Sequence, residues 1–418
     1  MLSKTLHAAL TKDGADPRGA KPFTTHLIAL ISTKLADGLI DPKLVLSWLL
    51  SALGAPGALI GALVPVREAG ALLPQIALSR MIARRRYRKY VWAAGSALQG
   101  FAALGMGAAA LLLDGAAAGW AVLGCLAVLA CARAACSASY KDIAARTLEK
   151  GTRGTVSGTA GTVSATLVFA FAAALALGLL PLEAWVIAAA LFVAGGLWIV
   201  GAGTFTALNE PAASPDDSPL AAADLLDPVL HDSEFRTYIA VRGLLIATAL
   251  APPFLLLLSA RGADNQLGNL GLLMVASALA AITSSYVWGR LSDRSSRQTL
   301  VISGALAAAA FGTAATLGLL ANSSGTFVLA GVLFVAQIAY EGVRAGRKTH
   351  LTDMDTGGDK ALYTALSNTM VGILLLAGGG FGLLADIAGP AVVLAVFAGL
   401  SAVAALAALG LSEVQQDT

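Results

Sequence analysis

Residues 33–43 read Thr33-Lys34-Leu35-Ala36-Asp37-Gly38-Leu39-Ile40-Asp41-Pro42-Lys43 and lie at the centre of an apolar run, residues 26–53. A run of this length can cross a bilayer, which takes roughly 20 apolar residues. Charge at membrane depth costs a few kcal/mol per residue, so it is rare unless it has a use. The spacing of Lys34, Asp37 and Asp41 places them on one helix face. Because Pro42 cannot donate a backbone hydrogen bond, the stretch predicts a kinked, polar-faced helix that lines an internal cavity.

The composition indicates the protein class. Of the 418 residues, 57% are hydrophobic and only 13% are charged, whereas a soluble domain has about 25% charged residues. The apolar segments are too long for the strands of an outer-membrane barrel. We therefore expect an all-α polytopic membrane protein, and the polar segment Met1–Lys21 predicts no cleavable signal.

Several function classes have no support in the sequence. The three cysteines form no CxxC pair, and the four histidines lack metal-ligand spacing. There is no nucleophile–base pair and no nucleotide-binding loop. We expect no metal, no cofactor, no enzymatic activity and no nucleic-acid partner.

The apolar runs predict about twelve membrane spans in two sets of six. The spans are expected at residues 26–53, 57–81, 89–113, 117–140, 155–180, 183–206, 237–259, 267–290, 299–320, 325–346, 362–385 and 389–411. The predicted organisation is an N-terminal segment 1–25, a six-helix half 26–206, an acidic linker 207–236 with one surface helix near 220–230, a second half 237–411 and a tail 412–418.

Basic residues predict the orientation. Arg84-Arg85-Arg86-Tyr87-Arg88-Lys89 follows the second span, and further basic residues follow the fourth, eighth and tenth spans. The loops on the other side carry almost no Lys or Arg. Both termini and the linker should therefore be cytoplasmic, with the protein in the cell inner (cytoplasmic) membrane.

One loop carries a family resemblance. Between the eighth and ninth spans the chain reads Gly289-Arg290-Leu291-Ser292-Asp293-Arg294-Ser295-Ser296-Arg297, which resembles the signature Gly-x-Leu-Ala-Asp-Arg-x-Gly-Arg-Arg of the major facilitator superfamily. The resemblance implies two six-helix pseudo-repeats that alternate between inward- and outward-open states. It also implies a gating loop in which Asp293 caps and pairs at helix ends, while Arg294 and Arg297 hold the cytoplasmic face closed; Gly289 belongs to the same motif.

The corresponding loop of the first half departs from the family pattern. Arg84 stands where the family usually has an aspartate. Either the first half lacks this contact between helix ends, or it uses another carboxylate such as Asp142 or Glu149.

Charged residues at membrane depth are the candidates for coupling in the first half. Arg67 and Glu68 in the second span are expected to join Lys34, Asp37 and Asp41 in one cluster, whereas Lys43 is expected to be peripheral. Such a cluster could bind protons or substrate, because burial favours the neutral form of a carboxylate and a nearby cation favours the charged form. The alternative is a fixed set of ion pairs that orders the helices.

Arg133 in the fourth span is a further candidate in the first half. Some proton-coupled members of the family have a functional arginine in this helix. The alternative is that Arg133 snorkels or pairs with a carboxylate.

The second half is more apolar, and its candidates are mainly uncharged. The expected cavity residues are Arg242, Tyr286, Gln337, Tyr340 and Asn368. Gly378-Gly379-Gly380 indicates close packing or a hinge in the eleventh span.

The leading functional hypothesis is a secondary transporter of a small organic solute, coupled to protons and acting as a monomer in the lipid bilayer. Two substrate classes remain open at this point. They are a carboxylated metabolite, bound by the few buried cations, and a lipophilic cation, bound by the acids in an apolar cavity. A non-transporting assembly or lipid-handling factor on the same fold is the alternative function.

Overall fold

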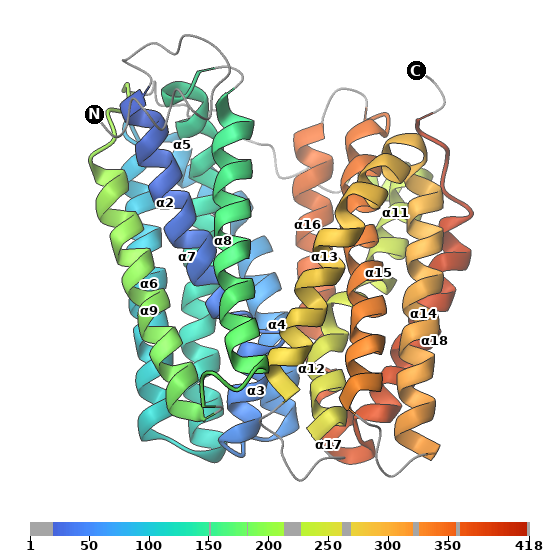
Figure 1. Cartoon of the computed structure of the whole chain (residues 1–418). Coiled ribbons are helices and arrows are strands. Elements are labelled where there is room, and N and C mark those ends of the chain that lie inside the picture. The colour runs from blue at the N-terminus through green and yellow to red at the C-terminus, as the bar shows by residue number, and fades with distance from the viewer. Residues whose placement is uncertain are drawn as a thin grey trace. The chain divides into compact units, whose positions relative to one another are not determined.

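The computed structural model describes residues 20–149, 152–181, 183–212, 227–260, 269–320, 326–356 and 360–415. Within these ranges every regular element is a helix (Figure 1). The helices of the first half are α2 Ala20–Leu39, α3 Val45–Ala52, α4 Gly57–Leu72, α5 Gln75–Ala83, α6 Lys89–Leu112, α7 Gly115–Thr147, α8 Thr152–Ala176 and α9 Ala184–Thr206. Those that follow are α10 Asp227–His231, α11 Ser233–Leu244, α12 Ala247–Ala260, α13 Asn269–Arg294, α14 Ser296–Leu320, α15 Thr326–Asp353, α16 Lys360–Gly378, α17 Gly380–Ala388 and α18 Pro390–Ala408.

The chain is a multi-pass membrane protein. Ten segments of the described ranges are long and apolar enough to cross a membrane, and two of them combine a pair of consecutive helices, α11 with α12 and α16 with α17. Large apolar side chains such as Phe101, Ile387 and Phe327 are well exposed on the helices. The remaining two predicted spans correspond to α2–α3 and α4–α5, whose helices are individually too short or too polar to qualify.

Several predicted spans are broken, which corrects the expectation of continuous or merely kinked helices. The first span stops at Leu39 and resumes at Val45, because the chain leaves the helix before Pro42. The hydroxyl of Ser47 donates to the Pro42 carbonyl at 2.8 Å and satisfies one freed backbone group. A second break precedes Gln75, next to Pro74.

The eleventh span also has a break. It falls at Gly379, within the glycine run that the sequence marks as a hinge or packing site. The predicted linker helix is seen only as α10, because residues 213–226 lie outside the described ranges.

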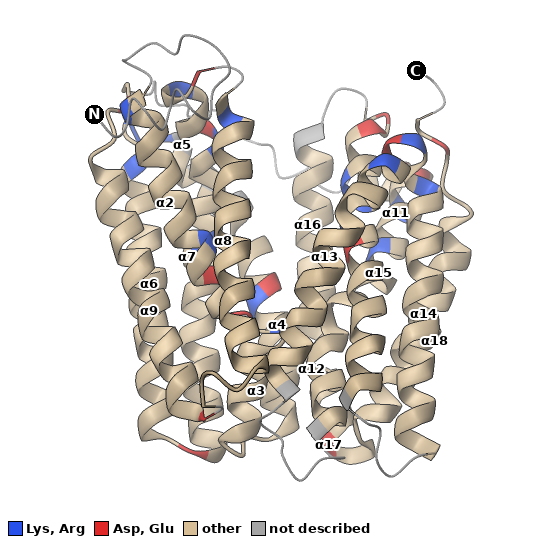
Figure 2. Cartoon of the chain, in the orientation of Figure 1, with Lys and Arg blue, Asp and Glu red and all other residues tan. Residues whose placement is uncertain are grey.

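Contacts divide the chain into two compact units. The first contains residues 1–41, 70–171 and 183–219, and the second contains residues 42–69, 172–182 and 220–418. Within the first unit α6 packs extensively on α9, and within the second α14 packs on α18 in the same manner. These are the third and sixth spans of each predicted half, so the equivalent pairs make equivalent contacts. In each unit most charged side chains gather at one end of the helices, and a few lie at mid-height (Figure 2).

At the charged end of the first unit, Asp142 joins two helices. Its carboxylate forms ion pairs with Arg88 and with Arg146, in each case with a nitrogen–oxygen distance of 2.8 Å. The pair of Asp142 on α7 with Arg88 is the kind of contact that the second alternative for this loop describes, and its role in gating stays a prediction. Beside it, Glu210 accepts from the backbone N–H groups of Arg88 and Lys89 at 3.1 and 2.8 Å. This carboxylate therefore satisfies donors at the start of α6, where negative charge is favourable.

Replacing Glu210 with glutamine is expected to lower the free energy of unfolding by about 1–2 kcal/mol, as loss of an N-cap does. Thermal unfolding in mild detergent measures this. Glu183→Gln is the matched control, because the Glu183 carboxylate accepts only from the indole N–H of the exposed Trp185 within the described chain. Equal melting temperatures for the two variants would contradict the capping role.

In the second unit, the family-like loop is arranged differently from the expectation. The turn between α13 and α14 is capped by Ser295, whose hydroxyl accepts from the N–H of Gln298 at 3.0 Å. Asp293 and Arg294 are exposed. Because Ser295 caps this turn, the role of Asp293 in capping or pairing stays a prediction. Arg297 pairs with Glu413 at 3.2 Å.

One contact in the second unit brings two backbones together. A Cβ atom added at Gly382 on α17 would lie 2.7 Å from the carbonyl oxygen of Ala58 on α4, closer than real Cβ atoms approach. A Cβ atom added at Gly61 would likewise lie 2.6 Å from the Cα atom of Gly382. Asp386 fixes the register by accepting from the Ala58 N–H at 2.8 Å. Small residues at such positions allow helices to approach closely in lipid.

Candidate functional site

A polar cavity lies inside the first unit, between α2, α6, α7 and α9. Its volume is about 270 Å³. Three of the residues predicted from the sequence line it: Lys34, Asp37 and Arg133. The other lining residues are Leu30, Thr33, Trp92, Gln99, Cys136, Ser137, Tyr140, Lys141 and Trp198.

An ion pair between Arg133 on α7 and Asp37 on α2 is the electrostatic centre of this cavity. Both side chains are only partly covered, and both line the cavity. Lys34, one helical turn before Asp37, donates to the carbonyl of Ser157 on α8 at 3.0 Å. With Lys141, the cavity wall carries three cations and one carboxylate. The local charge is therefore positive.

Aromatic residues connect the helices that form the wall of the cavity. Tyr140 is held by His26, whose Nδ1 lies 3.3 Å from its hydroxyl, and the other ring nitrogen of His26 lies 2.8 Å from the hydroxyl of Thr147. Trp92 packs against Phe205 with ring centroids 4.0 Å apart and the rings tilted by 35°. These contacts join α2, α6, α7 and α9, so they position the groups that face the cavity.

Gln99 and Lys141 line this cavity although they are not among the site residues predicted from the sequence. Gln99 on α6 is buried and lies 3.4 Å from the Cys136 thiol. An amide within an apolar span costs free energy to bury, and that signal could have identified it. Lys141 is one of the basic residues after the fourth span that indicate the orientation, and its side chain also lines the cavity.

The remaining charged candidates of the first half have different positions. Asp41 lies in the break after α2 and is not among the residues that line the cavity. Arg67 is buried and Glu68 half-buried on α4, which belongs to the second unit. Their membership in one cluster with Asp37 stays a prediction.

In the second unit, a buried arginine forms hydrogen bonds with uncharged side chains. Arg242 on α11 donates to the Ser367 hydroxyl at 2.6 Å and to the Asn368 amide oxygen at 3.0 Å, both on α16. Its exposed fraction is 7%, and its Nε has no hydrogen-bond partner in the part of the chain that the structure describes. No ion pair of Arg242 with an acidic residue is found among the described residues. The structure thus brings two predicted candidates, Arg242 and Asn368, together.

The other candidates of the second half are dispersed. Gln337 donates to Glu341 at 3.3 Å. Lys43, expected to be peripheral, lies with its Nζ 3.4 Å from the centre of the Tyr340 ring. Lys43 is not among the residues that line the cavity of Asp37, and its peripheral role stays a prediction. Tyr286 is 69% exposed and accepts from Arg290 at 3.2 Å.

Comparison with known proteins identifies the fold. No protein-family model matches the chain, and no curated protein matches it. Among solved structures, the nucleoside transporter NupG has a TM-score of 0.70 at 14% identity, with 93% of this chain and 99% of that chain covered. The peptide transporter POT has a TM-score of 0.70 at 13% identity, with 97% of both chains covered. These are major facilitator transporters.

The chain has the major facilitator fold. The resemblance seen in the loop after the eighth span is thereby confirmed at the level of the fold, which needs no close sequence identity. A third structure, a POT family transporter in complex with 5-aminolevulinic acid, has a TM-score of 0.71 at 10% identity and covers 93% of this chain and 95% of its own. At these identities the likeness shows the major facilitator architecture and assigns no subfamily.

Proposed function

We propose that this chain is a proton-coupled secondary transporter of a small organic solute that bears a carboxylate. The observation that carries the proposal is the cavity whose described lining contains three cations, Lys34, Arg133 and Lys141, and one carboxylate, that of Asp37. Ionisable groups at membrane depth are costly and usually functional. Because cations outnumber carboxylates in the described lining of this cavity, it favours a substrate with an anionic group over a lipophilic cation.

The buried arginine of the second unit supports the same substrate class. Arg242 has hydroxyl and amide partners, which solvate a guanidinium but do not neutralise it. Bidentate binding of a carboxylate is the interaction that arginine favours. One structural neighbour was crystallised with 5-aminolevulinic acid, which has a carboxylate, although that likeness concerns the fold alone.

Alternating access would use the two predicted halves, residues 26–206 and 237–411, as the moving bodies. The close backbone contact of Gly61 and Ala58 with Gly382 supports a seal that closes one side of the membrane. The basic loops support a protein of the inner membrane with both termini in the cytoplasm. A single chain contains both halves and therefore suffices for this mechanism.

Glu68 is the residue that we assign to proton binding. It is half-buried, and its carboxylate has no hydrogen bond or ion pair within the described chain. A carboxylate without a fixed cation can bind and release a proton as its surroundings change. Asp37, which is paired with Arg133, is less suited to this role.

Replacing Glu68 with glutamine is expected to abolish accumulation driven by a pH gradient, while exchange of substrate without a gradient continues. One coupled proton gives about a tenfold accumulation for each pH unit, which is about 1.4 kcal/mol. Uptake into reconstituted vesicles, with and without a gradient, measures the difference. Glu183→Gln is the control, because Glu183 lies before α9 at an exposed site. Unchanged accumulation in the Glu68 variant would contradict this assignment.

The transport proposal itself is tested with pairs of compounds. Small carboxylic acids and their uncharged amides are added to vesicles that hold the protein and a pH-sensitive dye, together with a set of lipophilic cations. We expect proton flux and thermal stabilisation with one or more acids but not with the matching amides. Flux with the cations alone would overturn the substrate class, and no flux with any compound would favour the non-transporting alternative.

A further inference from the structure

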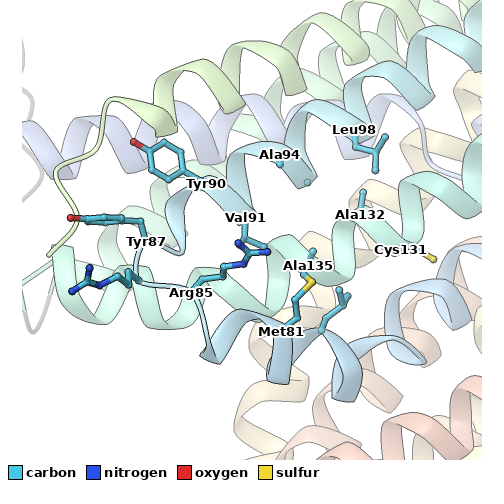
Figure 3. A pocket seen from close by; sticks show the side chains of 13 residues that line it. Met81, Arg85, Tyr87, Tyr90, Val91, Ala94, Leu98, Cys131, Ala132 and Ala135 are labelled. Carbon is cyan, nitrogen blue, oxygen red and sulfur yellow. The ribbon is translucent and has the colours of Figure 1, made fainter. Parts of the chain in front are cut away.

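A second hollow in the first unit lies on another face of α7, away from the polar cavity. It is a groove of about 660 Å³ between α5, α6 and α7 (Figure 3). Its floor and sides are apolar and include Leu78, Met81, Val91, Leu98 and Ala132. The groove shares no lining residue with the cavity that contains Asp37 and Arg133. It is therefore a separate site.

The apolar side chains of this groove are accessible at the surface of the unit. Met81 is 43% exposed and Leu98 is 47% exposed, and Cys131 is also exposed. Apolar residues exposed along membrane helices contact lipid rather than water. The natural occupant of the groove is therefore a hydrocarbon chain.

One end of the groove is basic and aromatic. Arg85 and Arg86 line it there, together with Tyr87 and Tyr90, which are 46% and 55% exposed. Figure 3 shows Arg85 extending from the connection between α5 and α6 toward Val91, with Leu98 and Cys131 at the far end. Tyrosines favour the membrane interface, and clustered cations there attract anionic headgroups.

The length of the groove matches one leaflet of a bilayer. Along α6, Tyr90 and Leu98 are separated by about 12 Å at a rise of about 1.5 Å per residue. Half of the hydrocarbon core measures about 15 Å. A lipid with its headgroup at Arg85 and Arg86 would therefore place an acyl chain along the apolar part of the groove.

We propose that this groove binds an anionic phospholipid of the cytoplasmic leaflet, with its phosphate on Arg85 and Arg86 and one acyl chain between α5, α6 and α7. The charge of the headgroup is complementary to the two guanidinium groups, which bind phosphate well. The leaflet follows from the orientation that the basic loops predict. A lipid bound here bridges the ends of the second, third and fourth spans.

The test is native mass spectrometry of the purified full-length protein with phosphatidylglycerol or phosphatidylcholine of identical acyl chains. We expect the wild type to retain phosphatidylglycerol in preference. The variant Arg85→Gln with Arg86→Gln should lose about fivefold in affinity for each charge removed, or about 25-fold in total. Arg290→Gln with Arg294→Gln removes two exposed cations elsewhere and should leave binding unchanged.

A second variant tests the acyl-chain part of the groove. Ala94→Trp fills the groove while it leaves both arginines in place, and it should weaken binding of phosphatidylglycerol. The alkylation rate of Cys131, followed by peptide mass spectrometry, should fall when phosphatidylglycerol is added to the wild type. Melting temperatures identify any variant that is not folded.

Three results would overturn the proposal. Equal retention of the two lipids by the wild type would show a groove without headgroup preference. Full retention by the double arginine variant would exclude the phosphate site. Full retention by the folded Ala94→Trp variant, with no protection of Cys131, would show that the lipid binds the basic surface and not the groove.

Discussion

Replacing Asp37 with asparagine is expected to lower transport about a hundredfold in every mode, including exchange without a gradient. The change leaves Arg133 without its carboxylate partner in the cavity. Because both groups are partly covered, the free energy of unfolding should fall by about 1–3 kcal/mol, between the values for an exposed and a buried pair. Uptake assays measure the loss of transport, and unfolding in detergent measures the change in the free energy of unfolding.

A double variant separates the structural and functional roles of this pair. Asp37→Asn combined with Arg133→Gln removes both charges, so stability should recover because no charge is left uncompensated. Transport should not recover, since the proposed carboxylate site is lost. Asp114→Asn is the control at an exposed position. If the double variant transported normally, the pair would be a structural ion pair only.

Replacing Gly382 with leucine is expected to abolish transport, again by about a hundredfold, while the protein still folds. The new side chain would need the space that the Ala58 backbone occupies. Interiors this closely packed do not deform continuously, so α4 and α17 would have to separate. The variant should therefore remain open on the side that these helices seal. Substrate binding should persist.

Labelling of single cysteines from each side of the membrane measures whether the Gly382→Leu variant remains open on one side. A reporter cysteine facing the cavity should react with an impermeant reagent from the side that α4 and α17 are proposed to seal in the wild type. Cys125, Cys131 and Cys136 are replaced in the background. Gly399→Leu is the matched control, because a Cβ there meets no atom within 4 Å. Normal transport by the Gly382 variant would mean that the contact is not part of the cycle.

The sequence was sufficient for the architecture and for part of the site. Long apolar runs and basic loops predicted the helical membrane fold, because the bilayer imposes both features. Charge within an apolar run predicted Lys34, Asp37 and Arg133, since burying charge is too costly to occur without partners. The cavity brings these three together.

Other features depend on contacts that no local pattern encodes. The first span is not one kinked helix, because α2 ends at Leu39 and α3 begins at Val45. Lys43, between these two helices, contacts the Tyr340 ring. The sequence leaves two alternatives for the contact of Asp142, because its partner Arg88 is distant in the chain, at the N-cap of α6. Gln99 gave only a weak signal, as a single amide in an apolar helix.

Arg242 also has an electrical consequence. Its positive charge is held by the Ser367 and Asn368 dipoles, so the second unit carries it even when no solute is bound. Moving one elementary charge through a potential of 100 mV changes the free energy by about 2.3 kcal/mol. In the proposed cycle, any movement of Arg242 across the membrane makes the resting state depend on voltage. A bound carboxylate cancels the charge, so the loaded protein moves with little electrical work.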